Sequence, residues 1–189
     1  MKLIRVGLIV EDQSDYEVIH SILDKIAARP FAVTRYLGHG CGKVIAKCGA
    51  WARQLRDQGC TLLIVVCDLD TRHLTELKGQ LETSLTPCPF QLHIIVIPVR
   101  EIEAWLLADH QAITQAMKLR KAAKKQANPE AIMRPKEHLG RLIFERSEKR
   151  TQYLNTVHNK QIAAAARITQ LRRCQSFRPL HQFAEQNLT

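Results

Sequence analysis

Three carboxylates stand directly after two apolar segments of this 189-residue chain. Glu11 follows residues 3–10, and Asp68 and Asp70 follow residues 61–67. If these segments are adjacent parallel strands, the three side chains meet at one sheet edge, where uncompensated anions repel one another. A divalent cation relieves that repulsion, and oxygen-only ligands favour Mg²⁺ or Mn²⁺. We therefore predict a metal site in which Asp68 and Asp70 hold the ion and Glu11 is a further ligand or proton carrier.

The elements that must position these acids alternate along the first part of the chain. β-branched, apolar runs predict strands, and longer amphipathic stretches between them predict helices. This alternation is typical of βαβ units with a mostly parallel sheet, in which ligands bind at the carboxyl ends of the strands. The capping-box pair Ser14 and Glu17 predicts the start of the first helix. The predicted strands are residues 2–10, 31–37, 61–67 and 92–99, and the predicted helices are 14–28, 43–57, 74–84 and 102–117.

The last third of the chain differs in both pattern and charge. Residues 1–117 carry 12 Lys and Arg against 13 Asp and Glu, whereas residues 118–189 carry 16 against 5. The strand signal ends at Met117, and helices are predicted over residues 115–126, 135–148 and 160–173. We therefore expect an α/β domain over 1–117 and a helical basic extension over 118–189 packed on it. Such an excess of positive charge favours contact with a polyanion, although a solvated basic surface also explains it.

Basic side chains of the extension are candidates for contact with a nucleic-acid backbone. The predicted helix 115–126 places several lysines on one face, and Arg167 joins a second cluster. Few aromatic residues accompany them, which favours phosphate contact over base stacking. The glycine-rich segment 38–43 is either a plain turn or a phosphate-contacting loop. The candidate nucleic-acid-binding residues are Lys43, Lys118, Arg120, Lys121, Lys124, Lys125, Arg172 and Arg173.

Composition and spacing exclude several other classes of protein. The longest apolar runs are too short to cross a bilayer, and the acids after residue 10 argue against a signal peptide. The six cysteines show no Cys-x-x-Cys pair, which predicts free, mostly buried thiols in a cytoplasmic chain and disfavours structural zinc. The initial sequence LIVED is similar to that of response-regulator receivers. A receiver needs Ser or Thr after its fourth strand and Lys after a fifth, and neither is present here.

A strand ending in Glu11, a helix and a later strand ending in Asp68-x-Asp70 resemble the toprim domain. This domain occurs in topoisomerases, primases, OLD-type nucleases and small ribosomal RNA maturases. The resemblance spans about residues 2–100 and implies a Rossmann-like fold and a metal site. Asp12 stands where the family usually has Gly, and Arg72 stands where a third aspartate can occur.

A narrower resemblance covers nearly the whole chain. Residues 97–109 (IPVREIEAWLLAD), Pro129-Glu, Pro135-Lys and residues 174–177 (CQSF) are similar to a prokaryotic toprim-like family, domain of unknown function 4276. Its members are often encoded beside ATPases in presumed defence or mobile regions. The resemblance implies a metal site made of Glu11, Asp68, Asp70, Glu101 and Glu103.

The residues around the last two acids allow a second interpretation. Glu101 and Glu103 also suit the amino terminus of a helix, where acids are favourable without any ligand. Trp105 and its leucine neighbours are expected in the core, and Asp109 is expected at the surface.

Two functions follow from this sequence as hypotheses. The first is an Mg²⁺- or Mn²⁺-dependent, toprim-like nuclease that hydrolyses phosphodiester bonds of DNA or RNA within a prokaryotic defence system. The alternative is a non-catalytic subunit that binds nucleic acid or an ATPase of the AAA or ABC type and keeps a vestigial metal site. The departures at Asp12 and Arg72 favour the alternative slightly.

Overall fold

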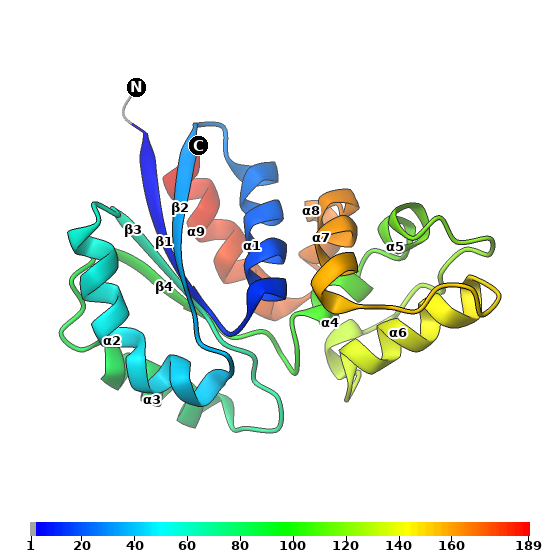
Figure 1. Ribbon diagram of the computed structural model, residues 1–189, viewed down its shortest axis with the longest axis horizontal. Coiled ribbons are helices and arrows are strands. Elements are labelled where there is room, and N and C mark those ends of the chain that lie inside the picture. Colours follow the sequence, from blue (N-terminus) through cyan, green and yellow to red (C-terminus); the bar gives the residue numbers. More distant parts are fainter. Residues whose placement is uncertain (1–2) are drawn as a thin grey trace.

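The computed structural model describes residues 3–189 as a central sheet flanked by helices (Figure 1). Strands and helices alternate as far as β4, and only helices follow. In chain order the elements are β1 (Ile4–Val10), α1 (Gln13–Ile26), β2 (Phe31–Leu37), α2 (Cys41–Asp57), β3 (Leu62–Val66), α3 (Leu74–Leu85), β4 (Leu92–Val96), α4 (Glu103–Leu107), α5 (His110–Ala116), α6 (Pro135–Arg146), α7 (Asn155–Ala165), α8 (Ile168–Leu171) and α9 (Arg178–Leu188), with short 3₁₀ turns at Pro129–Ala131 and Gln175–Phe177.

The sheet has the strand order β2-β1-β3-β4, and every pairing is parallel. The predicted α/β class is therefore confirmed, and the weakest predicted strand, 31–37, coincides with β2. β1 pairs directly with β3, with Val6 opposite Leu62 and Ile9 opposite Val65. This adjacency is the condition under which acids after the two strands meet at one edge.

Helices cover both faces of the sheet, which explains why its central strands are continuous apolar runs. Leu8 and Val10 of β1 belong to the hydrophobic cluster that contains α1, α4, α7 and α9. Ile9, between them in sequence, belongs to the opposite cluster with α2 and α3. In Figure 1, α2 and α3 lie on one side of the sheet, and α1 and α9 on the other.

The helical extension is part of the main core. α7 packs on α1, and α9 packs on both α1 and β4. Trp105 is fully buried, as predicted, and its ring meets Phe177 edge-on at a centroid distance of 5.3 Å. Its indole Nε1 donates to Ser176 Oγ at 2.8 Å, so its polar atom is also satisfied. One hydrophobic cluster thus joins the sheet to the carboxyl-terminal helices.

Two predicted helices take a different course from the one expected. The stretch 102–117 is divided into α4 and α5 by Asp109, whose carboxylate accepts the backbone N–H groups of Gln111 and Ala112. Asp109 is fully buried, so its predicted surface position is wrong. The helix over 115–126 is also wrong, because α5 ends at Ala116 and Lys118 has a φ of 47°. Lysines three and four residues apart would repel one another along such a helix.

Smaller corrections concern the ends of helices. Asp12, not Ser14, is the N-cap of α1, and its capping-box partner is Asp15 rather than Glu17. The helix expected over 160–173 is instead two helices, because α7 ends at Ala165 and α8 begins at Ile168. α9 was not predicted, because Pro179 suggests a break; here it occupies the first turn of a helix, where proline is tolerated. No helix within residues 3–189 has the length and apolarity needed to cross a bilayer.

Candidate functional site

The first strand-end acid contacts the loop after the neighbouring strand directly. Glu11 follows β1, and its Oε1 accepts the backbone N–H of Asp68 at 2.8 Å, just beyond β3. The Cys67 sulfur lies 3.4 Å from the same oxygen. The parallel pairing of β1 and β3 therefore brings Glu11 and Asp68 together, as the sequence predicts.

Two further acids join this pair, and we call Glu11, Asp15, Asp68 and Glu103 the acidic cluster. Burial is the largest cause that raises the pKa of each of the four carboxyl groups. The pKa of Asp68 is raised well above its usual range by burial and then by the negative charges of Asp15 and Glu103. The pKa of Asp15 is raised in the same way, by burial and then by the negative charges of Asp12 and Glu103. The strand ends, α1 and α4 thus concentrate negative charge at one site.

The carboxyl-terminal extension orients one member of the cluster. Glu103, only 4% exposed, accepts a hydrogen bond from Asn159 Nδ2 at 3.0 Å and one from the Tyr153 hydroxyl at 3.3 Å. Asn159 also donates to Ser14 Oγ at 2.8 Å, and its Oδ1 accepts from Tyr153 at 2.5 Å. Asn159 on α7 therefore connects the start of α1 to Glu103 on α4.

The remaining two predicted ligands occupy other positions. The Asp70 side chain is largely exposed. Its carboxyl pKa is raised overall, because the part of the side chain that is buried raises the pKa more than the charge of Arg72 lowers it. Its charge also raises the pKa of Glu11, which places it at the rim of the acidic cluster. Glu101 Oε2 accepts the backbone N–H of Lys136 at 2.8 Å, so its carboxylate caps the amino terminus of α6. Glu101 thus caps α6 and not α4, the helix that follows it in the sequence.

The loops at this edge adopt an unusual backbone conformation. His39, Asp70 and Arg100 all have positive φ angles, of 55°, 51° and 66°. Asp70 N donates to Arg100 O at 2.8 Å, and Arg100 Nη1 donates back to Asp70 O at 3.0 Å. His39 N donates to Glu11 O at 2.6 Å. Left-handed residues other than glycine are costly and cluster at functional sites, and three of the strand-end loops contain one.

Sulfur and a guanidinium border the cluster on the α2 side. Cys41 and Cys67 form a disulfide with a Cα–Cα distance of 5.9 Å, so the expectation that all six thiols are free is wrong. Arg72 Nη1 lies 2.7 Å from the Cys41 sulfur. The four other cysteines are free, and only Cys88 among them is partly exposed.

The donor set of the cluster determines which metal fits it. Within residues 3–189, the only acid, cysteine or histidine ligand atoms that gather in threes within 4.8 Å belong to Glu11, Cys41 and Cys67. The carboxylates therefore do not form a tight three-acid cage. Mg²⁺ does not need one, because it binds through one or two carboxylates, keeps several waters and takes phosphate oxygens from a substrate. The acidic cluster fits that kind of ion.

Most of the predicted nucleic-acid contacts lie on the surface. Lys43, in the first turn of α2, is exposed at the same sheet edge as Glu11. Residues 118–125 form an irregular segment rather than one helical face, and Lys118, Lys121 and Lys125 are exposed there. Arg120 pairs with Glu148 at 3.1 Å. Arg172 is exposed beyond α8.

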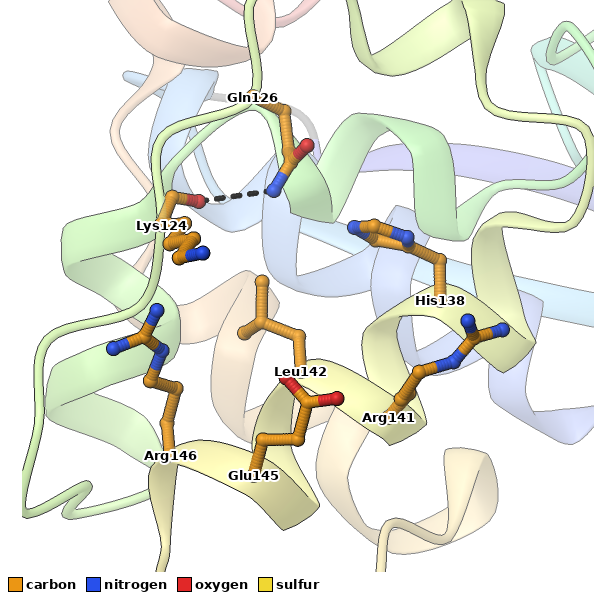
Figure 2. Close-up of a pocket in the computed structure, with 7 residues that line it drawn as sticks. All are labelled: Lys124, Gln126, His138, Arg141, Leu142, Glu145 and Arg146. Atoms are coloured by element: carbon orange, nitrogen blue, oxygen red, sulfur yellow. Dashed lines mark hydrogen bonds between the residues drawn. The ribbon is translucent and has the colours of Figure 1, made fainter.

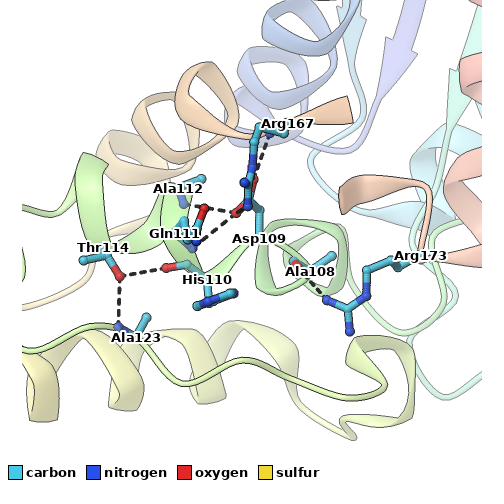
Figure 3. Close-up of polar contacts among 9 residues, drawn as sticks. All are labelled: Ala108, Asp109, His110, Gln111, Ala112, Thr114, Ala123, Arg167 and Arg173. Atoms are coloured by element: carbon cyan, nitrogen blue, oxygen red, sulfur yellow. Dashed lines mark hydrogen bonds and ion pairs between the residues drawn. The ribbon is translucent and has the colours of Figure 1, made fainter. Parts of the chain in front are cut away.

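Two arginines of the second predicted cluster make internal contacts (Figure 3). Arg167 binds the buried carboxylate of Asp109 with Nε at 2.9 Å and Nη2 at 2.8 Å. Burial raises the pKa of Asp109, but hydrogen bonds from Arg167 and from backbone N–H groups outweigh it and lower the pKa overall. Arg173 donates to the carbonyl oxygens of Ala108, Gln126 and Ala127. Both side chains therefore hold the extension against α4 and α5.

Three residues of the site were missed by sequence reasoning. Asp15 had a usable signal, because it lies one helical turn beyond Glu11 on the first turn of α1. Asn159 and Tyr153 had none, because they reach Glu103 from 56 and 50 residues away along the chain. Only the packing of α7 against α1 and α4 brings them there.

The open parallel sheet makes this an α/β protein, and its acids gather at the carboxyl edge, where proteins of this class bind their ligands. The family described as Domain of unknown function (DUF4276) matches residues 10–184, and the chain belongs to this family. No curated protein and no solved structure matches it. The function must therefore be argued from the site.

Proposed function

We propose that this protein is a cytoplasmic, toprim-like nuclease that uses Mg²⁺ or Mn²⁺ to hydrolyse phosphodiester bonds of DNA or RNA. The observation that carries the proposal is the acidic cluster, in which the negative charges of Asp15, Glu103 and Glu11 surround Asp68 and raise the pKa of its carboxyl group further than burial alone. A divalent cation bound there would compensate this charge, and phosphate oxygens of the substrate would complete its coordination. The basic surface of the extension supplies attraction for a polyanion.

Three residues of the cluster have a direct role in this proposal. Asp68 and Glu103 would hold the metal, and the ion would supply a polarised water and stabilise charge on the phosphate oxygens. Glu11 is held at 2.8 Å by the backbone of Asp68 and serves as a further ligand or as the proton carrier. In hydrolysis the water oxygen bonds to phosphorus, the bond to the leaving oxygen breaks, and that oxygen takes up a proton. Asn159 and Tyr153 are positioning residues, because they act through Glu103.

Cleavage of labelled DNA and RNA by the purified chain tests this proposal. We expect turnover with Mg²⁺ or Mn²⁺, none with EDTA, and none in Asp68→Asn. Asp57→Asn is the matched control, because Asp57 is an exposed acid at the far end of α2. Loss of activity in the control as well, or metal-independent cleavage by Asp68→Asn, contradicts the proposal.

One observation favours the second candidate, a non-catalytic subunit that binds nucleic acid or a neighbouring ATPase. Arg72 places a guanidinium, rather than a third acid, on the Cys41 sulfur beside the cluster. This candidate predicts that DNA or RNA binds equally well to the parent and to Asp68→Asn at low salt, with no turnover in either. A pull-down with the tagged chain then tests whether an AAA- or ABC-type ATPase is the partner.

A further inference from the structure

A basic pocket of about 290 Å³ lies between the irregular segment after α5 and helix α6 (Figure 2). Lys124 comes from the segment, whereas His138, Arg141, Glu145 and Arg146 come from α6. His138, Arg141 and Glu145 are spaced three and four apart, so they share one face of the helix, and Arg146 lies at the margin of that face. The pocket includes only one of the predicted nucleic-acid contacts, Lys124, and none of the residues of the acidic cluster.

The cations of the pocket lack internal partners. Within residues 3–189, Lys124, Arg141 and Arg146 form no ion pair, although Glu145 lines the same pocket. Three cations and one carboxylate leave an excess of two positive charges when His138 is neutral. Uncompensated charge of one sign in a concave site concentrates ligands of the opposite sign.

His138 adds an unsatisfied polar atom to this group. Its Nε2 atom is buried and has no hydrogen-bond partner among the described residues. Figure 2 shows the ring extending from α6 toward the segment that carries Gln126. Gln126 Nε2 donates to Lys124 O at 3.1 Å, a bond within the segment that forms the other wall of the pocket. A buried polar atom without a partner is unfavourable, and an anion seated between the two walls would accept a hydrogen bond from Nε2 when that nitrogen carries the proton.

The charge and the size of the pocket select the ligand. A phosphomonoester carries about −1.5 to −2 at pH 7, which matches the excess charge of the lining. A phosphodiester inside a strand carries a single negative charge and presents fewer free oxygens. Arginine forks bind phosphate in a bidentate manner, and Arg141 and Arg146 supply two of them. The volume of about 290 Å³ leaves room for a phosphate group together with the sugar that carries it.

We propose that this pocket binds the terminal phosphomonoester of a nucleic-acid strand. The inference rests on the proposed function, since it assumes that the ligand of this protein is nucleic acid. Helix α6 links the two sites, because Lys136 at its start donates to Glu101 beside the acidic cluster. The helix rises about 1.5 Å per residue, so Arg141 lies about 8 Å farther along its axis. A strand end held in the pocket therefore lies within a few nucleotides of the acidic cluster.

Binding measured in EDTA, where no metal supports hydrolysis, tests the pocket separately from catalysis. The probes are fluorescent single strands of one sequence with a 5′-phosphate, a 3′-phosphate or hydroxyl groups at both ends. We expect the full chain to bind one phosphorylated strand at least about tenfold more tightly than the hydroxyl-ended strand. Arg141→Gln and His138→Gln should each remove this preference. Arg150→Gln is the control: Arg150 is exposed, the charge change equals that of Arg141→Gln, and all probes should weaken alike.

Three outcomes would overturn the inference: equal affinity for all strands, a preference that survives both pocket variants, or a nucleoside monophosphate that binds as tightly as the phosphorylated strand. Melting temperatures of the variants exclude misfolding as the cause of a lost preference. Metal-dependent cleavage without any end preference refutes the pocket alone. An end preference without cleavage in Mg²⁺ or Mn²⁺ refutes the nuclease proposal alone.

Discussion

Replacement of Asn159 by Ala tests whether the extension orients the acidic cluster. Asn159 is fully buried and makes three hydrogen bonds, with Ser14, Glu103 and Tyr153. At about 1 kcal/mol for each bond, Asn159→Ala should lower the free energy of unfolding by about 3 kcal/mol. For a chain of this length, that loss lowers the melting temperature by about 6–12 °C.

Circular dichroism during heating in EDTA measures this change without any contribution from metal. Gln161→Ala is the control, because Gln161 is exposed on the same helix and should change stability by less than about 0.5 kcal/mol. In addition, Glu103 loses a donor that fixes its carboxylate, so metal affinity or turnover should fall about 10–100-fold. A melting temperature equal to that of Gln161→Ala would show that the Asn159 contacts carry no stability, and the reasoning would fail.

Three further predictions concern the metal, the buried aspartate and the cysteines. Mg²⁺ at 100 times its Kd should stabilise the parent by about 2.7 kcal/mol in a thermal melt, and Asp68→Asn should show no such rise. Asp109→Ala should cost about 0.5–2 kcal/mol at pH 7 through its lost cap. Because the folded-state pKa of Asp109 is lowered, its contribution is present above the unfolded pKa and disappears as pH falls through the folded value, so parent and variant melts should converge on acidification. In guanidinium, a thiol reagent should count four thiols before reduction and six after it, and six before reduction would contradict the Cys41–Cys67 bond.

The part of the site that was predictable lies on neighbouring strands. Glu11 and Asp68 could be predicted because each follows an apolar strand, and parallel pairing brings such ends to one edge. Glu101 could not be assigned in the same way. Its position in the sequence suits either the amino terminus of a helix or a metal ligand. Only the position of α6 shows that its carboxylate caps that helix at the backbone N–H of Lys136.

The fold was predictable as far as local pattern determines it. β2 begins where its hydrophobic pattern predicts, and α6 begins at Pro135, a residue that favours the first turn of a helix. The division between α4 and α5 depends on Asp109, whose burial requires Arg167 from 58 residues away. Local sequence contains no information about that partner, so an unbroken helix was the natural expectation.

The same long-range dependence explains why the extension belongs to the site as well as to the core. Glu103 is held at the acidic cluster only while α7 supplies Asn159, and α6 is fixed beside it through Lys136 and Glu101. The helix that carries the basic pocket is therefore anchored at its first turn to the loop that precedes Glu103. Helix α6 thus connects the basic pocket, which we propose binds the phosphate at a strand end, to the acidic cluster, where we propose a phosphodiester is cleaved.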